Sequence, residues 1–251
     1  NYALEIASLK SVKTSLPAIE GDAIAKKELS ARLTAYQNLL FNSLFINFEK
    51  ANWRFNNQKI TSKNLSSIAS NVSDQVYHLT PKIQNELVIR EKLSTMAVAG
   101  SYGLINRILN NSHEKNLGME GYPAEFGIYL SIIKANKLHR SIKGDLKFVE
   151  PEKSIKELRA LYDEFVKCVK SKDGPTPVSE LYDLFGKQPF GLKKGLIPIL
   201  LAVFYMTNEG SFALYNTDEQ GKEFLITDYD RRICERFIHA PESLKMMFVK
   251  I

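Results

Sequence analysis

The sequence predicts a mainly α-helical protein with small β-hairpins, in which a helical bundle is followed by winged-helix-like modules. Three observations predict this fold class. Apolar residues recur at steps of three and four through the first half of the chain. Glycine and proline then divide the second half into short helical patterns, and two of these precede segments typical of a hairpin. With 251 residues, 44% of them hydrophobic, the chain is long enough for one large domain or two modest ones.

Residues 1–56 predict helix, with a turn at residues 20–22. Asp22 follows a glycine and is expected to cap the next helix, which should run for roughly 25 to 30 residues. Its apolar face consists of Leu29, Leu33, Tyr36, Leu40, Leu44 and Phe48. That face is widened by Leu39, Phe41, Phe45 and Trp53. Because the apolar surface is broader than a coiled-coil seam, we expect this helix to pack on two sides, as a scaffold or a connector.

A second helical block spans residues 60–117. Helical patterns cover residues 63–71 and 82–110, and Pro81 is expected to open the longer helix because its fixed φ suits the first turn. Small residues at 94–103 permit close packing between helices, and a ligand groove is the alternative interpretation. Together these patterns predict a helical domain over residues 1–117.

Residues 118–170 predict a winged-helix-like module with a linking helix. A helix is expected over about 124–135, followed by a hairpin over 138–149 that turns at Gly144. A helix from Pro151 to about Lys170 completes this segment. The hairpin is basic, with His139, Arg140, Lys143 and Lys147.

Residues 177–251 predict a second winged-helix-like module, after a breaker at 171–177 that is the best linker candidate. Two prolines and two glycines at 188–198 precede a strongly apolar helix, of which residues 196–206 must be buried. The expected elements are helices at 178–186, 196–207 and 228–238, a hairpin of 212–215 with 224–226, and a strand at 245–249.

The motifs of catalysis and metal binding do not occur in this sequence. The glycines at 191 and 195 have the wrong spacing for a P-loop, and the four histidines have no partner at metal-ligand spacing. Asp228 and Asp230 are interpreted as caps of the following helix, with a metal or catalytic pair as the alternative. We therefore assign no catalytic, cofactor-binding or metal-binding residue to this segment, and an independent enzyme is the least favoured hypothesis.

Cys168 and Cys234 are interpreted as buried free thiols of a cytoplasmic protein. No apolar run approaches the roughly 20 residues that a membrane span requires, so no membrane contact is expected. The chain starts without a methionine and runs directly into amphipathic sequence. We therefore expect it to be a fragment of a longer protein.

The charge balance is compatible with a nucleic-acid surface. The chain has 34 basic and 28 acidic residues, a net charge of +6, and a solvated lysine-rich surface is the competing interpretation. Because the helix at 196–206 is apolar, we expect contacts to phosphates and no base readout by that helix. The candidate nucleic-acid-binding residues are Lys187, Lys193, Lys194, Arg231, Arg232 and Arg236.

Several short strings, in order, resemble a region of the large bacterial P-loop ATPases of phage-defence islands, the BREX type and its relatives. These strings lie at residues 77–87, 93–94, 117–118, 122–125, 189–192 with Gly195, 198–202, 213–215 and 241–242. The resemblance covers roughly residues 35–250. It implies a helical and winged-helix accessory segment, downstream of the nucleotide-binding core and without catalytic residues of its own.

Two functions are therefore carried forward. The first is a non-catalytic interaction segment of a multidomain ATPase, whose partners are DNA and other domains or subunits of the parent protein. The alternative is a protein–protein assembly scaffold that does not bind nucleic acid.

Overall fold

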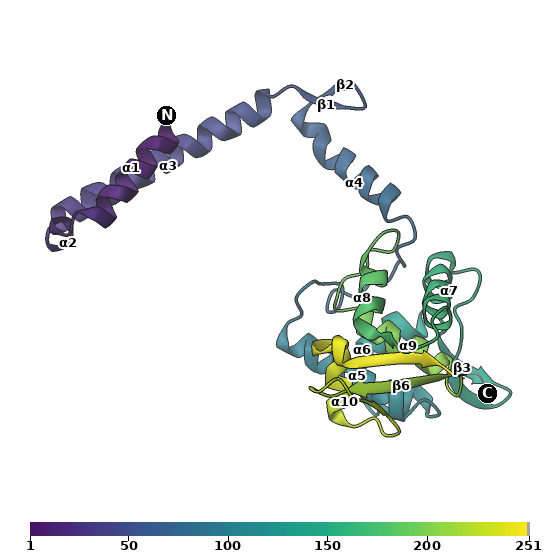
Figure 1. Ribbon diagram of the computed structural model, residues 1–251. Helices are drawn as coiled ribbons and strands as arrows, with labels where there is room; N and C mark the ends of the chain where they lie inside the picture. The colour runs from purple at the N-terminus through teal and green to yellow at the C-terminus, as the bar shows by residue number, and fades with distance from the viewer. Residues whose placement is uncertain (250–251) are drawn as a thin grey trace. The chain divides into compact units, whose positions relative to one another are not determined.

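A computed structural model describes residues 1–249 of the chain and confirms the fold class (Figure 1). The described residues are mainly helical, with small antiparallel hairpins. The chain forms two compact units, and the boundary between them falls after Val72. The sequence-based boundary lay at 117/118, so the structure divides the chain about 45 residues earlier.

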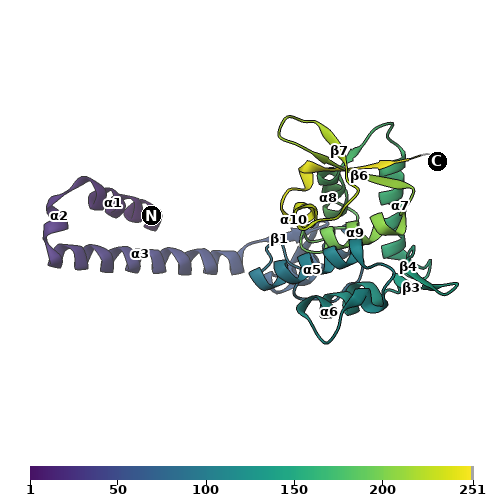
Figure 2. The ribbon, with the colours of Figure 1, turned by 90° about the horizontal axis from the view of Figure 1, so that it is seen from below.

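The first unit is built around a helical hairpin. Asp22 caps α3 (Ala23–Lys50) as expected, because its carboxylate accepts hydrogen bonds from the amides of Ile24 at 2.8 Å and Ala25 at 3.1 Å. α1 (Tyr2–Ser15) and the short α2 (Ala18–Gly21) precede it. Figure 2 shows α1 lying along the half of α3 that follows the cap. Within this unit, α1 therefore covers one side of one half of α3.

A small hairpin follows α3 and was missed in the sequence. β1 (Trp53–Phe55) pairs antiparallel with β2 (Gln58–Ile60). The turn between them uses Asn56 and Asn57 with φ of 49° and 63°, a left-handed conformation that asparagine tolerates. The chain continues through η1 (Ser62–Asn64) and α4 (Leu65–Val76).

The helix expected over residues 82–110 begins only at α5 (Thr95–Asn110), capped by Ser94. Residues 77–94 are irregular, so the expectation that Pro81 opens a helix is wrong. The physical reason is that this stretch bonds to the loop ahead of α9. The Leu79 amide donates to the Pro189 carbonyl at 3.2 Å, and the Arg90 carbonyl accepts from the Gly195 amide at 3.2 Å. These two tertiary hydrogen bonds, together with local turns such as the one from the Val88 amide to the Asn85 carbonyl, take the place of helical hydrogen bonds in this stretch.

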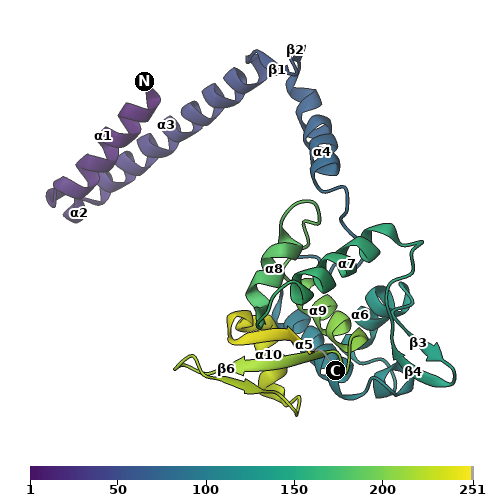
Figure 3. The same cartoon turned by 45° about the vertical axis from the view of Figure 1, so that its right-hand side comes forward.

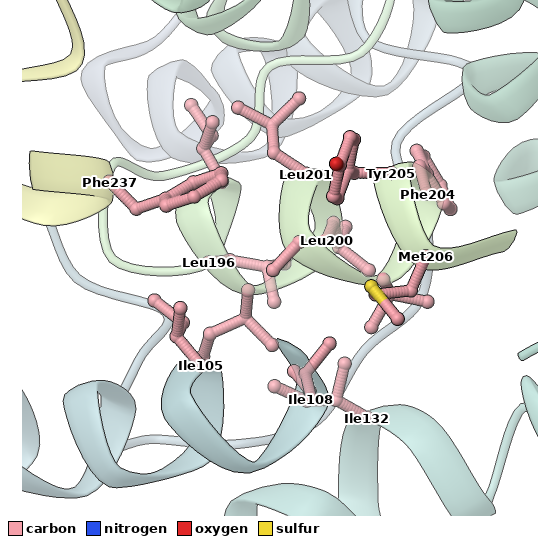
Figure 4. Packing of buried hydrophobic residues seen from close by; sticks show 14 of the residues in the cluster. Ile105, Ile108, Ile132, Leu196, Leu200, Leu201, Phe204, Tyr205, Met206 and Phe237 are labelled. Carbon is pink, nitrogen blue, oxygen red and sulfur yellow. The ribbon is translucent and has the colours of Figure 1, made fainter. Parts of the chain in front are cut away.

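The core of the second unit surrounds α9 (Ile197–Thr207), in which every residue from Ile197 to Met206 is buried. The sequence-based expectation of burial is confirmed. Helices α5, α8 (Val178–Gly186) and α10 (Arg231–His239) all contact α9. Figure 4 shows side chains of α5 and α10 around it. Each fully buried Leu, Ile or Phe contributes about 1.5–3 kcal/mol relative to exposure, so the burial of α9 is a large part of the hydrophobic stabilisation of this unit.

The hairpin expected over 138–149 is present as β3 (His139–Ile142) and β4 (Asp145–Phe148). Its strands contact the core through β4 and α9. The helices around this hairpin are η2 (Lys115–Gly118), α6 (Ala124–Ile128), η3 (Tyr129–Lys134, with π-helical hydrogen bonding) and α7 (Lys156–Lys170).

The C-terminal strands form one four-stranded antiparallel sheet, in the order β5-β8-β6-β7. Figure 3 shows β6 of this sheet beside α10. The expected hairpin of β6 and β7 and the expected last strand β8 are both present, and β8 pairs with β6 along its length. β5 was not predicted. The strands and the turn before β8 are β5 (Thr176–Pro177), β6 (Phe212–Thr217), β7 (Glu223–Leu225), η4 (Pro241–Ser243) and β8 (Leu244–Phe248).

A single hydrophobic core runs from Ile83 to Met246 and draws residues from all three expected segments, 1–117, 118–170 and 177–251. Both cysteines are free thiols, but only Cys234 is buried, while Cys168 is half-buried. Among residues 1–249, no helix combines the length and the apolar character needed to cross a bilayer.

The backbone at Gly195 packs closely against residues 88–93, and this contact predicts how a substitution there changes the stability of the fold. A Cβ atom there would lie 2.5 Å from both the Leu93 side chain and the Val88 carbonyl oxygen. We expect Gly195→Ala to lower the free energy of unfolding by about 1–3 kcal/mol, because the backbone of residues 88–93 must shift. Urea unfolding of the full chain measures the change.

Gly127→Ala is the matched control. Gly127 lies inside α6, and a Cβ there would meet no atom within 4 Å. We expect this variant to be unchanged or more stable by up to about 1 kcal/mol, because alanine favours helix. Equal stability of the two variants would contradict the packing role of Gly195.

Candidate interaction surfaces

Three of the six candidate nucleic-acid-binding residues lie in the loop between α8 and α9. Lys187 contacts Asp183 at 2.8 Å, and Lys194 contacts Glu91 at 3.0 Å. Lys193 lies on the wall of a cleft of about 960 Å³. Two of the three ammonium groups therefore already have a carboxylate partner.

The other three candidates lie on α10. Arg231 contacts Glu235 at 3.2 Å, Arg232 contacts Asp230 at 3.1 Å, and Arg236 donates to the side-chain oxygen of Asn216. Exposed ion pairs contribute about 0–1 kcal/mol, so the exposed Arg231 and Arg232 stay accessible to other anions, whereas Arg236 is half-buried. The structure distributes the six candidates over a loop and a helix.

Asp230 caps α10, as the sequence indicates. Its carboxylate accepts a hydrogen bond from the amide of Ile233 at 2.9 Å. This hydrogen bond and the contact with Arg232 lower the pKa of Asp230 below its ordinary value. The capping interpretation of Asp230 is therefore confirmed.

The Pro189–Leu192 segment is held by its backbone. Thr80 donates its hydroxyl to the Phe190 carbonyl, and the ring of Tyr77 lies where a Cβ on Gly191 would be. Gly191 has a φ of 63°, which favours glycine. The amides of Gly191 and Leu192 both donate within the protein, to the carbonyls of Lys187 and Phe185. These amides are therefore engaged in packing and do not point at a ligand.

The cleft beside this segment contains Ser73, Asp74 and His78. The His78 ring contacts the Gln75 carbonyl at 3.1 Å, and in residues 1–249 no hydrogen bond joins it to the Ser73 hydroxyl. Nucleophilic catalysis requires such a link between nucleophile and base. Within the described part of the chain, no cluster of histidine, cysteine, aspartate and glutamate is arranged to hold a metal ion.

The second half of α3 exposes a stripe of large apolar side chains. Phe41 is 68% exposed, Leu44 60%, Phe45 55% and Phe48 46%. These four residues, called the α3 stripe below, have the i, i+3, i+4, i+7 spacing of one helix face. The Phe41 and Phe45 rings stack at 6.4 Å. We expected α3 to pack on two sides, but within the first unit α1 covers one side, and beyond it the stripe is contacted at Phe48 by the Trp53 ring at 4.7 Å.

The β3–β4 hairpin borders a groove of about 530 Å³. Arg140 and Lys147 lie directly opposite each other on the two strands and share a face of the hairpin with Ile142. The end of α9 and the residues after it form the other wall. The hairpin groove is defined below by His113, Arg140, Ile142, Lys147, Met206 and Glu209. Sequence reasoning recognised the basic hairpin but did not include it among the candidate nucleic-acid-binding residues.

A buried histidine holds the hairpin in place. His139 donates from Nε2 to the Ser112 carbonyl at 2.7 Å, and its Nδ1 accepts from the Tyr129 hydroxyl at 3.1 Å. Burial lowers the pKa of His139 below its ordinary value, with the Ser112 hydrogen bond acting in the opposite direction. The neutral ring thus links the hairpin to the backbone next to His113.

Comparison of the chain with protein-family models, with curated proteins and with solved structures found no match.

The buried His139 predicts a pH dependence of stability. Its pKa is lower in the folded protein than in the unfolded chain, where it is about 6.5. As the pH falls below about 6.5, the unfolded state binds a proton first, so the free energy of unfolding decreases until the folded pKa is passed. Above that range both states are neutral at this residue and it has no effect.

Urea unfolding between neutral and acidic pH tests this. We expect His139→Gln to reduce the loss of stability on acidification, since the titrating group is removed. His78→Gln, at an exposed histidine, should leave the pH dependence as in the unmodified chain. The same pH dependence in both variants would exclude His139 as its source.

Proposed function

We propose that this chain is a non-catalytic interaction segment that binds other proteins through the α3 stripe. A single observation carries the proposal: four large apolar side chains follow one face of a helix that the first unit leaves uncovered. Helices with apolar residues on more than one side are normally buried on more than one side.

The size of the stripe supports a specific contact. A Phe side chain buries about 150–250 Å² in a protein interior. At the observed exposures, the four residues together leave about 400 Å² of apolar surface in water. Exposed apolar patches of a few hundred Å² mark interaction sites on soluble proteins.

The composition of α3 favours a protein as the occupant. No charged residue occurs between Arg32 and Glu49. Binding to a nucleic acid requires cations that contact phosphates, and amphipathic helices that bind membrane surfaces are rich in lysine and arginine. An uncharged aromatic stripe fits an apolar groove on another protein.

The partners that we propose are other domains or subunits of a larger protein. The ordered strings that resemble BREX-type phage-defence ATPases support a parent of that class. DNA contact by Lys187, Lys193, Lys194, Arg231, Arg232 and Arg236 stays a prediction. A cytoplasmic location is supported by the two free cysteines.

Light scattering tests the stripe directly. We expect the mass of the full chain to rise with protein concentration, because the stripe associates with itself when its partner is missing. The double variant Phe41→Gln, Phe45→Gln should shift this rise to about tenfold higher concentration or beyond, since two large apolar side chains are lost. Added duplex DNA should leave the self-association unchanged.

Tyr122→Gln is the matched control, because Tyr122 is a 92% exposed aromatic residue of the second unit. It should self-associate like the unmodified chain. A mass independent of concentration in the unmodified chain would contradict the proposal, and so would an equal effect of Tyr122→Gln.

A further inference from the structure

We propose that the hairpin groove binds a phosphate group. This site is separate from the α3 stripe and from the six candidate nucleic-acid-binding residues, and it lies entirely within the second unit. Three observations point to it: an arrangement of like charges, a donor without an acceptor, and a wall in which one of the two carboxylates is bound to an arginine.

The first observation is the pairing across the hairpin. Arg140 and Lys147 are direct partners in the register of β3 and β4. Like charges directly opposite each other destabilise a strand pair. Both side chains border the same groove, so an anion between them would convert this repulsion into two attractive contacts.

The second observation is the Nε of Arg140. This atom is buried and has no hydrogen-bond partner, whereas Nη1 of the same guanidinium donates to the Glu152 carboxylate at 3.0 Å. Glu152 also accepts from Lys137 at 3.4 Å, so its charge is shared between two cations. Buried donors in proteins are almost always paired with an acceptor. The Arg140 side chain as a whole is 42% exposed, so the accessible part of its guanidinium can donate to a phosphate oxygen, a group that it matches in geometry.

The third observation concerns the acidic residues of the wall. Glu150 lines the groove, where it is bound to Arg159 at 2.8 Å. The Glu209 carboxylate, on the wall opposite the hairpin, would repel a bound anion. His113 offers an additional ring N–H, and its backbone neighbour Ser112 is held by His139. Arg159 is also bound to Asp163 at 2.9 Å, so the attraction for an anion comes from Arg140 and Lys147 and is opposed by Glu209.

Two probes distinguish a free phosphate from the phosphodiester backbone of a nucleic acid. Inorganic phosphate, titrated by calorimetry against chloride at the same ionic strength, reports a free phosphate. A labelled duplex DNA, followed by fluorescence anisotropy at several salt concentrations, reports a nucleic-acid backbone. We expect the full chain to bind at least one of them.

The variants Arg140→Gln and Lys147→Gln should each weaken that binding about tenfold, because each removes one charge-assisted hydrogen bond to the phosphate. Glu209→Gln should strengthen it, because the opposing charge is removed. Lys143→Gln is the matched control: it removes the same charge from the turn of the same hairpin, outside the groove, and should have little effect. Lys147 is exposed, so its variant should keep the fold, which thermal unfolding checks.

Phosphate binding that depends on Arg140 and Lys147 supports a site for a free phosphate group. If only DNA binds, the source is a phosphodiester backbone. In that case Lys147→Gln should lower the slope of the logarithm of the binding constant against the logarithm of the salt concentration by about one. The proposal is overturned if neither probe binds, if Arg140→Gln and Lys147→Gln bind like the unmodified chain, or if Lys143→Gln weakens binding equally.

Discussion

The exclusion of water from every side of α9 is the constraint on which the second unit depends. A helix with no polar face requires cover all round, and α5, α8, α10 and the β3–β4 hairpin provide it. The loop before α9 must also pass close to residues 77–93, which is why glycines stand at 191 and 195. The same contacts hold residues 77–94 out of a helix. One buried helix thus determines both its neighbours and the irregular backbone around its start.

The first unit meets the opposite situation. α3 has no charged residue between Arg32 and Glu49, but α1 is too short to cover that stretch, so the α3 stripe stays in contact with water. The two units therefore differ in whether the surface of their most apolar helix is buried. In the second unit the apolar surface of α9 is enclosed, and charged groups collect where the end of α9 meets the β3–β4 hairpin. In the first it is open.

The sequence predicted what local rules determine. The caps at Asp22 and Asp230, the bounds of α8 and the turn at Gly144 follow from residues within a few positions of each other. Residues 82–94 have a helical pattern, but the Arg90 carbonyl accepts from Gly195 in the distant loop ahead of α9, a contact that no local rule includes. The Asn-Asn turn of β1 and β2 was a readable signal that was missed. The hairpin groove joins His113, the hairpin and Glu209, and only the fold brings these together.

The burial of α9 has a consequence for the motions of the second unit. Amide protons exchange with water only when their hydrogen bonds open, and protection rises with the number of contacts that must break first. Elements on four sides enclose α9, so its amides can exchange only when the unit opens as a whole. The slowest exchange in α9 thus measures the global unfolding of this unit, and faster exchange in β3 and β4 measures how often the hairpin detaches on its own.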